Sequence, residues 1–189
     1  MTLEEIKNLI LRRAYSGVFE QGTEETFNLH TYAHENGIDN DEAWKAFEEL
    51  KGEGLIDYYV LGGIVVSTST GILYSEKHKI VDEAMIVYQN KIRTKLLVTL
   101  AEIQERSAQG DMVDSEEWAR EAEVNNQDFA NNVRVLEDSE MIKRETPRDY
   151  LITRSGQEKV KDYKKRVKRL EDFEKLGKLE GVTNLLIIV

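Results

Sequence analysis

The chain has 189 residues, 40% of them hydrophobic and 33% charged, which is typical of a soluble globular protein with room for one large or two small domains. It contains no cysteine, which excludes disulfides and thiolate metal sites. Its net charge of −10 argues against a nucleic-acid partner, but the charge is uneven: residues 1–90 hold 7 basic and 16 acidic side chains, whereas residues 91–189 hold 19 and 20.

The two ends of the sequence differ from targeting or anchoring segments. Glu4 and Glu5 stand where a signal peptide would carry basic residues, and no apolar run approaches membrane-spanning length. Together with the absence of cysteine, this predicts a cytoplasmic protein. Residues 185–189 are all apolar and predict a strand or an intersubunit plug rather than an anchor.

The first predicted elements are two helices. Thr2 and Glu5 have the spacing of a capping box, so a helix is expected to begin at residue 3, and apolar residues then recur at helical intervals. A polar loop at 17–26 precedes a short second helix that ends near Gly37.

A third helix and a hairpin follow. Asp39 is the expected cap of this helix, which stops at Gly52. Residues 55–61 and 64–66 are β-forming and are separated by a Gly-Gly pair at 62–63, the pattern of a hairpin with a tight turn.

The same order of elements is predicted in the second half of the chain. A connecting helix at 76–90 leads into a helix at 91–105, and two further helices are expected to be capped near Asp114 and Asn125. A second hairpin turns around Pro147, the only proline of the chain, where the missing N–H costs no ladder hydrogen bond.

A basic helix is predicted at 157–177. Its apolar residues Val160, Tyr163, Val167 and Leu170 recur at 3-4-3 spacing, which gives a narrow stripe like that of a coiled coil. The stripe is expected to be either part of the core or the seam of a homodimer.

The two halves repeat one another. Residues 38–56 lie over 124–142 at an offset of 86, and the Thr-x-x-Gly that begins at Thr68 matches one that begins at Thr153 at an offset of 85. A repeat of this length predicts two copies of one supersecondary unit, so it decides the expected fold before any single motif does.

Both halves resemble the winged helix-turn-helix, in which three helices are followed by a two-stranded wing. Residues 150–156, Tyr-Leu-Ile-Thr-Arg-Ser-Gly, are similar to the Tyr-x-Leu-Thr-x-x-Gly that closes the wing in repressors of the multiple-antibiotic-resistance and phenolic-acid-decarboxylase types. The resemblance implies a mainly α fold with small β-hairpin wings. We expect a first, acidic winged-helix domain at 1–75, a connecting helix at 76–90, a second winged-helix domain at 91–156, the basic helix at 157–177 and an apolar tail at 178–189.

The resemblance also implies a DNA-binding transcriptional regulator, because the third helix of such a unit enters the major groove and the wing touches the backbone or minor groove. In the second copy this helix is rich in asparagine and glutamine, whose side-chain amides can pair with adenine, and lysine and arginine residues surround the wing. The candidate DNA-binding residues are Asn126, Gln127, Asn131, Asn132, Arg134, Lys143, Arg144, Arg148, Arg154 and Lys165. A solvated helix face with asparagine caps is the alternative.

The third helix of the first copy is acidic, with Asp41, Glu42 and Glu48 among its charges, and would repel phosphate. This copy is therefore predicted to dock a protein partner or to pack internally. An alternative function is that of a protein-interaction scaffold, made of tandem winged helices that bind no DNA. A ligand-gated regulator, with a small molecule bound in a cleft, also stays open.

The predicted basic helix contains like-charge neighbours, such as Lys161 and Lys165, that an anionic partner would stabilise. That partner is either DNA phosphate or the acidic first copy. The alternative is an ordinary solvated helix exterior in which the lysine stems cover apolar surface. A homodimer through this helix is expected, although one chain with two copies could also mimic a dimer and stay monomeric.

No residue pattern predicts catalysis or a cofactor. His30 and His34 have a spacing that can hold a metal on a helix, but no third ligand follows at a recognisable spacing, so no metal is predicted. Trp44 and Trp118 fall beside apolar residues at repeat positions and are predicted to pack.

Overall fold

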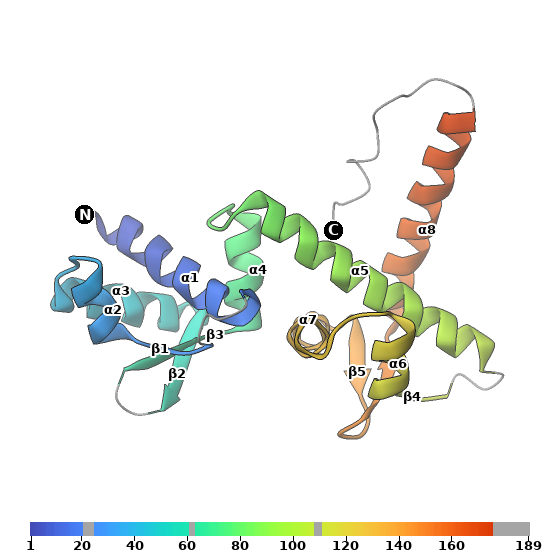
Figure 1. Cartoon of the computed structure of the whole chain (residues 1–189), viewed down its shortest axis with the longest axis horizontal. Coiled ribbons are helices and arrows are strands. Elements are labelled where there is room, and N and C mark those ends of the chain that lie inside the picture. Colours follow the sequence, from blue (N-terminus) through green and yellow to red (C-terminus); the bar gives the residue numbers. More distant parts are fainter. Residues whose placement is uncertain (21–24, 61–62, 108–110, 176–189) are drawn as a thin grey trace. The chain divides into compact units, whose positions relative to one another are not determined.

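The computed structural model describes residues 1–20, 25–60, 63–107 and 111–175, so the predicted tail at 178–189 and Gly62 lie outside the described residues. The chain divides into two units, Met1–Ile86 and Val87–Val189. Each unit is mainly helical and contains one small three-stranded antiparallel sheet (Figure 1). The described part of the chain has no helix that is long and apolar enough to cross a membrane.

The elements of the first unit come in the predicted order, except that a short strand, which was not predicted, precedes the second helix and makes the sheet three-stranded. These are α1 (Leu3–Phe19), β1 (Phe27–Asn28), α2 (Leu29–Glu35), α3 (Asn40–Gly52), β2 (Ile56–Val60), β3 (Ile64–Ser67) and α4 (Ser69–Lys77). The sheet has the strand order β1-β3-β2, with Phe27 opposite Val65 and Ile56 opposite Ser67. The hairpin expected from the Gly-Gly pair is thus confirmed.

The first helix begins as predicted and ends later than predicted. The amide of Glu5 donates to Thr2 Oγ1 at 3.2 Å, and the amide of Thr2 donates to Glu5 Oε2 at 2.7 Å, which confirms the capping box. Instead of a loop from residue 17, α1 continues to Phe19 because Gly17 and Val18 are buried against the unit.

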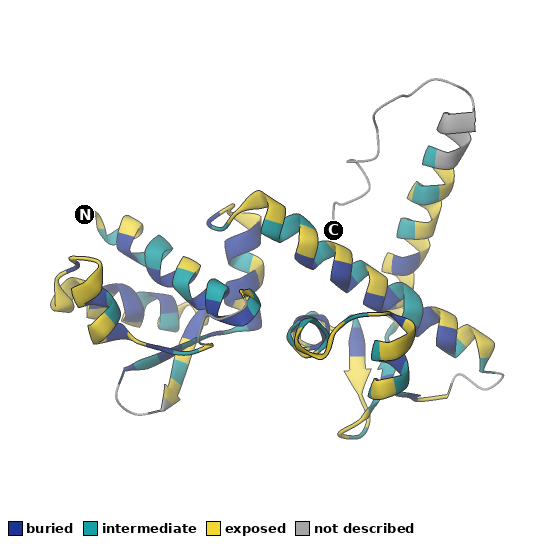
Figure 2. Cartoon of the chain, in the orientation of Figure 1, coloured by how far each residue is buried: buried dark blue, intermediate teal, exposed yellow. Residues whose placement is uncertain are grey.

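Helix α3 places its apolar residues on one buried stripe, and Trp44 lies at the edge of this stripe. Asp39 caps the helix as expected, and Ala43, Phe47 and Leu50 are buried in the core of the unit. Trp44 lies beside that stripe rather than on it, so it packs against Phe47 and Tyr58, as predicted, but is 44% exposed. Figure 2 shows the alternation of buried and exposed residues along the helices.

The second unit repeats this order. Its elements are α5 (Glu83–Arg106, which begins at the end of the first unit), β4 (Val113–Asp114), α6 (Ser115–Glu121), α7 (Asn126–Asp138), β5 (Ile142–Arg144), β6 (Asp149–Ile152) and α8 (Arg154–Lys175). The strand order is β4-β6-β5, which matches that of the first sheet. The predicted connecting helix at 76–90 is not a separate element, since α4 ends at Lys77 and α5 runs without a break into the helix expected at 91–105.

The core of the second unit is built around Trp118, which has no exposed surface. Its indole Nε1 donates to the carbonyl oxygen of Leu96 on α5 at 2.9 Å, and its ring contacts Phe129 and Tyr150, with centroids 5.0 and 5.5 Å away. Val160, the first residue of the stripe on α8, joins this core. The prediction that Trp118 packs is therefore confirmed.

The Thr-x-x-Gly motif closes the hairpin in the same way in both units. In the first, the amide of Gly71 donates to Thr68 Oγ1 at 3.0 Å, and a Cβ on Gly71 would lie 1.9 Å from the carbonyl oxygen of Leu55. In the second, the amide of Gly156 donates to Thr153 Oγ1 at 3.1 Å, and a Cβ on Gly156 would lie 2.2 Å from the carbonyl oxygen of Met141. Each glycine thus allows the outgoing helix to pass directly against the backbone that enters the hairpin.

Candidate nucleic-acid interface

Helix α7 is fixed at its N-terminus by a small polar cluster. The side chain of Asn125 caps the helix by accepting from the amide of Asp128 at 2.9 Å, and Asn125 Nδ2 donates to Asp128 Oδ2 at 2.7 Å. The hydroxyl of Tyr88, on α5, donates to the same carboxylate at 3.0 Å. This hydrogen bond and partial burial raise the pKa of Tyr88. The start of α7 is therefore anchored to α5.

The outer face of α7 carries several of the predicted DNA-binding residues. Asn126, Gln127 and Arg134 are exposed, and Asn131 is half-buried. Gln127 Nε2 donates to Asn131 Oδ1 at 3.2 Å, one helical turn further on. The structure brings these four side chains to one face of one helix, which is what a major-groove reader requires.

Asn132 was predicted to bind DNA, and the structure shows that this prediction is wrong. It has no exposed surface, and its Nδ2 donates to Gln89 Oε1 and to the carbonyl oxygen of Asp128, both at 2.9 Å. Its position three residues after Phe129 places it on the inward stripe of α7. A buried side chain that is held in this way cannot contact a base. The repeat contained a signal for this, because residue 132 matches the buried Ala46 at the offset of 86.

Each predicted cation of the wing is paired with an acid. Lys143 Nζ lies 2.6 Å from Glu145, Arg144 lies 2.9 Å from Glu137, and Arg154 lies 3.1 Å from Glu158. These ion pairs were not predicted from the sequence.

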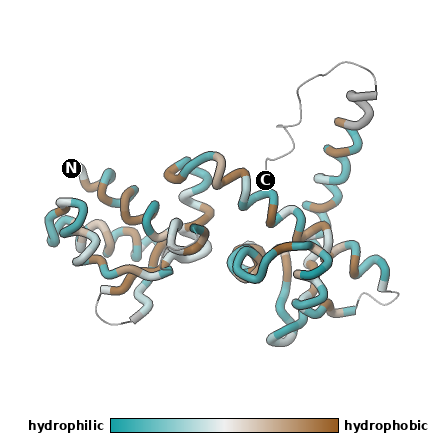
Figure 3. Tube along the Cα trace, in the orientation of Figure 1, coloured by the Kyte–Doolittle hydropathy of each residue, from teal (hydrophilic) through white to brown (hydrophobic). Residues whose placement is uncertain are grey.

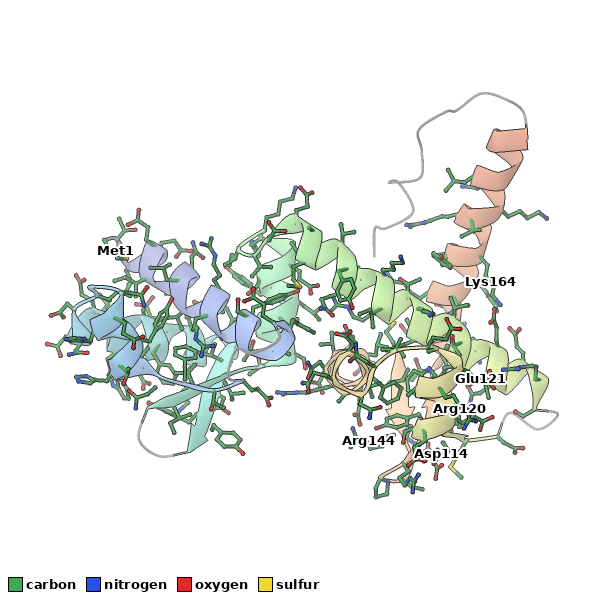
Figure 4. The ribbon with its side chains drawn as sticks, viewed as in Figure 1. Met1, Asp114, Arg120, Glu121, Arg144 and Lys164 are labelled. Carbon is green, nitrogen blue, oxygen red and sulfur yellow. The ribbon has the colours of Figure 1, made fainter. Side chains whose placement is uncertain are left out.

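Arg148 bridges two elements in a similar manner. It contacts Asp114 at 3.4 Å and Glu116 at 2.6 Å, both at the start of α6. Figure 4 labels Asp114 and Arg144 on the second unit. Ion pairs as exposed as these contribute about 0–1 kcal/mol each, so a phosphate could replace the carboxylates at little cost.

Helix α8 adds cations that lie further from the sheet. Lys164 Nζ lies 3.5 Å from Glu102 and 3.9 Å from Glu105, both on α5 (Figure 4). Lys165 is exposed, and no ion pair of Lys165 occurs within the described ranges. Figures 1 and 3 show α8 extending past the other elements of its unit, mostly hydrophilic with a few hydrophobic positions.

A groove lies at the base of α8 within the second unit, with a volume of about 460 Å³. Its lining combines apolar and polar side chains: Ala101, Gln104, Glu105, Leu151, Ile152, Gln157, Val160, Lys161 and Lys164. Gln104 is already engaged, because its Oε1 accepts from the amide of Ile152 at 3.0 Å. The groove therefore offers two lysines and an apolar floor, and its shape defines no particular ligand.

The same surface of the first unit is chemically different. Helices α3 and α7 have the same length and match at an offset of 86, so Trp44 corresponds to Ala130 and Glu48 to Arg134. The two exposed histidines, His30 and His34, lie on α2, and no group of three potential metal ligands gathers in the part of the chain that the structure describes.

Comparison with protein-family models, with curated proteins and with solved structures finds no match to this chain.

Proposed function

We propose that this chain is a DNA-binding transcriptional regulator made of two winged helix-turn-helix units, and that the second unit reads DNA through α7. The order of helices and strands, the strand order of each sheet and the shared Thr-x-x-Gly junction support this assignment. They agree with the resemblance found in the sequence.

The observation that carries the proposal is the contrast between the matched helices. At the position where α3 presents Glu48, α7 presents the exposed Arg134, and around it lie the amides of Asn126, Gln127 and Asn131. Amides and guanidinium groups are the side chains that pair with base edges, whereas carboxylates near phosphate are repelled. The two units therefore differ at the one surface that would meet DNA.

Phosphate contacts would come from the wing and from α8. Lys143, Arg144 and Arg148 are exposed on the hairpin, and Lys165 is exposed on α8. Since the ion pairs of the wing are weak, a DNA backbone can exchange with their carboxylates. Contacts of this kind position a protein on DNA without reading its sequence.

The test is the titration of a fluorescently labelled duplex with the full chain at several salt concentrations. Three to five phosphate contacts would give a slope of log affinity against log salt of roughly −3 to −5. Lys165→Glu should weaken binding to all sequences and lower that slope by about 1. Lys45→Glu makes the same charge change at an exposed site of the first unit and should leave DNA affinity unchanged.

The second candidate is the interaction scaffold, and the acid partners of the wing cations favour it. If the duplex does not bind at about 25 mM salt, the DNA-binding proposal fails. If Lys45→Glu weakens binding as much as Lys165→Glu, the assignment of DNA binding to the second unit fails.

A further inference from the structure

Trp44 is a large apolar side chain that packs against other rings at the surface. Its ring stacks on Phe47, with centroids 5.5 Å apart, and contacts Tyr58 at 6.1 Å. A Cβ at Gly63, in the turn of the hairpin, would lie 3.5 Å from it. These neighbours support one side of the ring, while 44% of the residue stays open to solvent. An aromatic ring that is both ordered and exposed is typical of a contact surface.

Acidic groups surround this ring. Asp41 and Glu48 flank Trp44 at helical spacing, and the hydroxyl of Tyr58 donates to Glu48 Oε1 at 3.0 Å. Burial, followed by this hydrogen bond, raises the pKa of Tyr58. Lys51 Nζ already lies over the Tyr58 ring, 4.2 Å from its centroid. We call Asp41, Trp44, Glu48 and Tyr58 the Trp44 face.

The chemistry of the Trp44 face suits a cation that is attached to an apolar segment. A tryptophan ring is the best aromatic acceptor of a lysine or arginine side chain, and the neighbouring carboxylates add direct ion pairs. Residues 1–86 carry 7 basic and 16 acidic side chains, a net charge of −9, which would attract a cationic partner over a distance.

Helix α8 has the complementary properties. It carries 9 basic and 5 acidic residues, a net charge of +4, over 22 residues and about 33 Å. Val160 is buried in the core, but Tyr163, Val167 and Leu170 continue the stripe as half-exposed side chains. The helix thus presents an unfinished apolar stripe with cations beside it.

Pairing of two α8 helices along this stripe would bring like charges together. At about 100° per residue, Lys159 and Arg166 fall on one side of the stripe and Lys164 on the other. These positions flank the seam of a coiled coil: in a parallel pair Lys159 would meet Lys164 of the second copy and be repelled, whereas Arg166 would meet Glu171, so charge gives a symmetric seam little net support. An acidic, partly aromatic surface would satisfy both the stripe and its cations.

We infer that the Trp44 face of one copy binds α8 of a second copy. If each chain supplies both surfaces, two reciprocal contacts close a twofold dimer. The inference does not depend on DNA binding, because Lys165 falls on the opposite side of α8 from the stripe. DNA and the second copy would therefore use different sides of this helix.

Sedimentation velocity of the full chain tests this at 50 and 500 mM NaCl over a range of concentrations. We expect a dimer at low salt that dissociates at high salt. Glu48→Lys and Arg166→Glu should each weaken dimerisation by about tenfold or more, because each opposes like charges at the contact. An equimolar mixture of the two variants should dimerise again, since the changed sites then attract one another.

Lys165→Glu is the control on α8, and Glu35→Lys, at an exposed site on α2, is the control on the first unit; both should keep most of the dimer. Circular dichroism would verify that every variant is folded. A chain that is monomeric at all concentrations at 50 mM NaCl overturns the inference. The inference is also overturned if Glu48→Lys leaves the dimer intact, or if the mixture of Glu48→Lys and Arg166→Glu does not dimerise.

Discussion

The side-chain amide of Asn132 donates a hydrogen bond to Gln89 Oε1 at 2.9 Å in the interior of the second unit. Its neighbour Asn131 is the half-buried acceptor of Gln127 on the outer face of the same helix. Two adjacent asparagines therefore lie in different environments, one buried in the core and one on the outer face of the helix.

Alanine substitutions should distinguish these two environments. Asn132→Ala removes a buried donor and leaves polar groups without it, so we expect the free energy of unfolding to fall by about 1–2 kcal/mol. Asn131→Ala should change it by less than about 0.5 kcal/mol and instead reduce the discrimination between DNA sequences. Urea denaturation followed by Trp118 fluorescence, in a Trp44→Phe background, reports on the second unit. Equal stability losses for the two variants would contradict this assignment.

The two glycines of the Thr-x-x-Gly junctions should tolerate no side chain. Gly71→Ala would place a Cβ 1.9 Å from a backbone oxygen, and Gly156→Ala one at 2.2 Å. Because backbone must move to relieve such overlaps, each change should cost at least about 2 kcal/mol. Gly52→Ala is the matched control: a Cβ at this position would meet no atom within 4 Å and the φ of Gly52 is not left-handed, so the alanine should be neutral or slightly stabilising. Thermal unfolding of the three variants gives the comparison.

The elements were predictable from sequence where short-range signals decide them. The capping box at Thr2, the cap at Asp39 and the pairing of the two hairpins depend on residues close together in sequence, and the structure has all of them. Helix ends that depend on tertiary burial were missed, as at the end of α1, where Gly17 and Val18 are covered by the rest of the unit.

The candidate site was less predictable than the fold. Polarity alone placed Asn132 on the surface, although helical spacing puts it on the buried stripe with Val133. Trp44 was predicted to pack because it falls beside apolar residues at a repeat position, but this signal did not show that it lies at the edge of the buried stripe of α3 and stays 44% exposed. The ion pairs of Arg148 with Asp114 and Glu116 join residues far apart in sequence and depend on how α6 and the hairpin approach each other, whereas the pair of Arg154 with Glu158 has the i,i+4 spacing of a helix and could have been predicted. No local pattern predicts the Arg148 pairs.

The ion pair between Lys7 and Glu49 should give the first unit a defined pH dependence. Lys7 Nζ lies 2.6 Å from Glu49 Oε2 and joins α1 to α3. The hydrogen bond between them lowers the pKa of Glu49 below 4.5 and raises that of Lys7 above 10.5.

The sign of the effect follows from these two directions. The lowered pKa of Glu49 means that its contribution to stability is present above pH 4.5 and is lost as the pH falls through the pKa of the folded state. The raised pKa of Lys7 means that its contribution is lost only above pH 10.5. Glu49→Gln should therefore lower the denaturation midpoint at pH 7, and the difference from the unchanged chain should shrink as the pH falls below 4.5. A difference that is constant from pH 7 to pH 3 would mean that the ion pair does not contribute.

Removal of the acids that pair with the wing cations should strengthen DNA binding if α7 and the hairpin meet the duplex. Glu137 lies 2.9 Å from Arg144 and would stand close to the phosphate that this arginine contacts. Glu137→Gln keeps the shape of the side chain, removes one negative charge and frees the guanidinium. We expect affinity at low salt to rise about two- to fivefold, the order of the effect of one unit charge near a protein surface. Glu35→Gln removes the same charge from the first unit and should have no effect on the duplex titration. A loss of affinity in Glu137→Gln, or an equal gain in both variants, would mean that this face of the second unit does not approach phosphate.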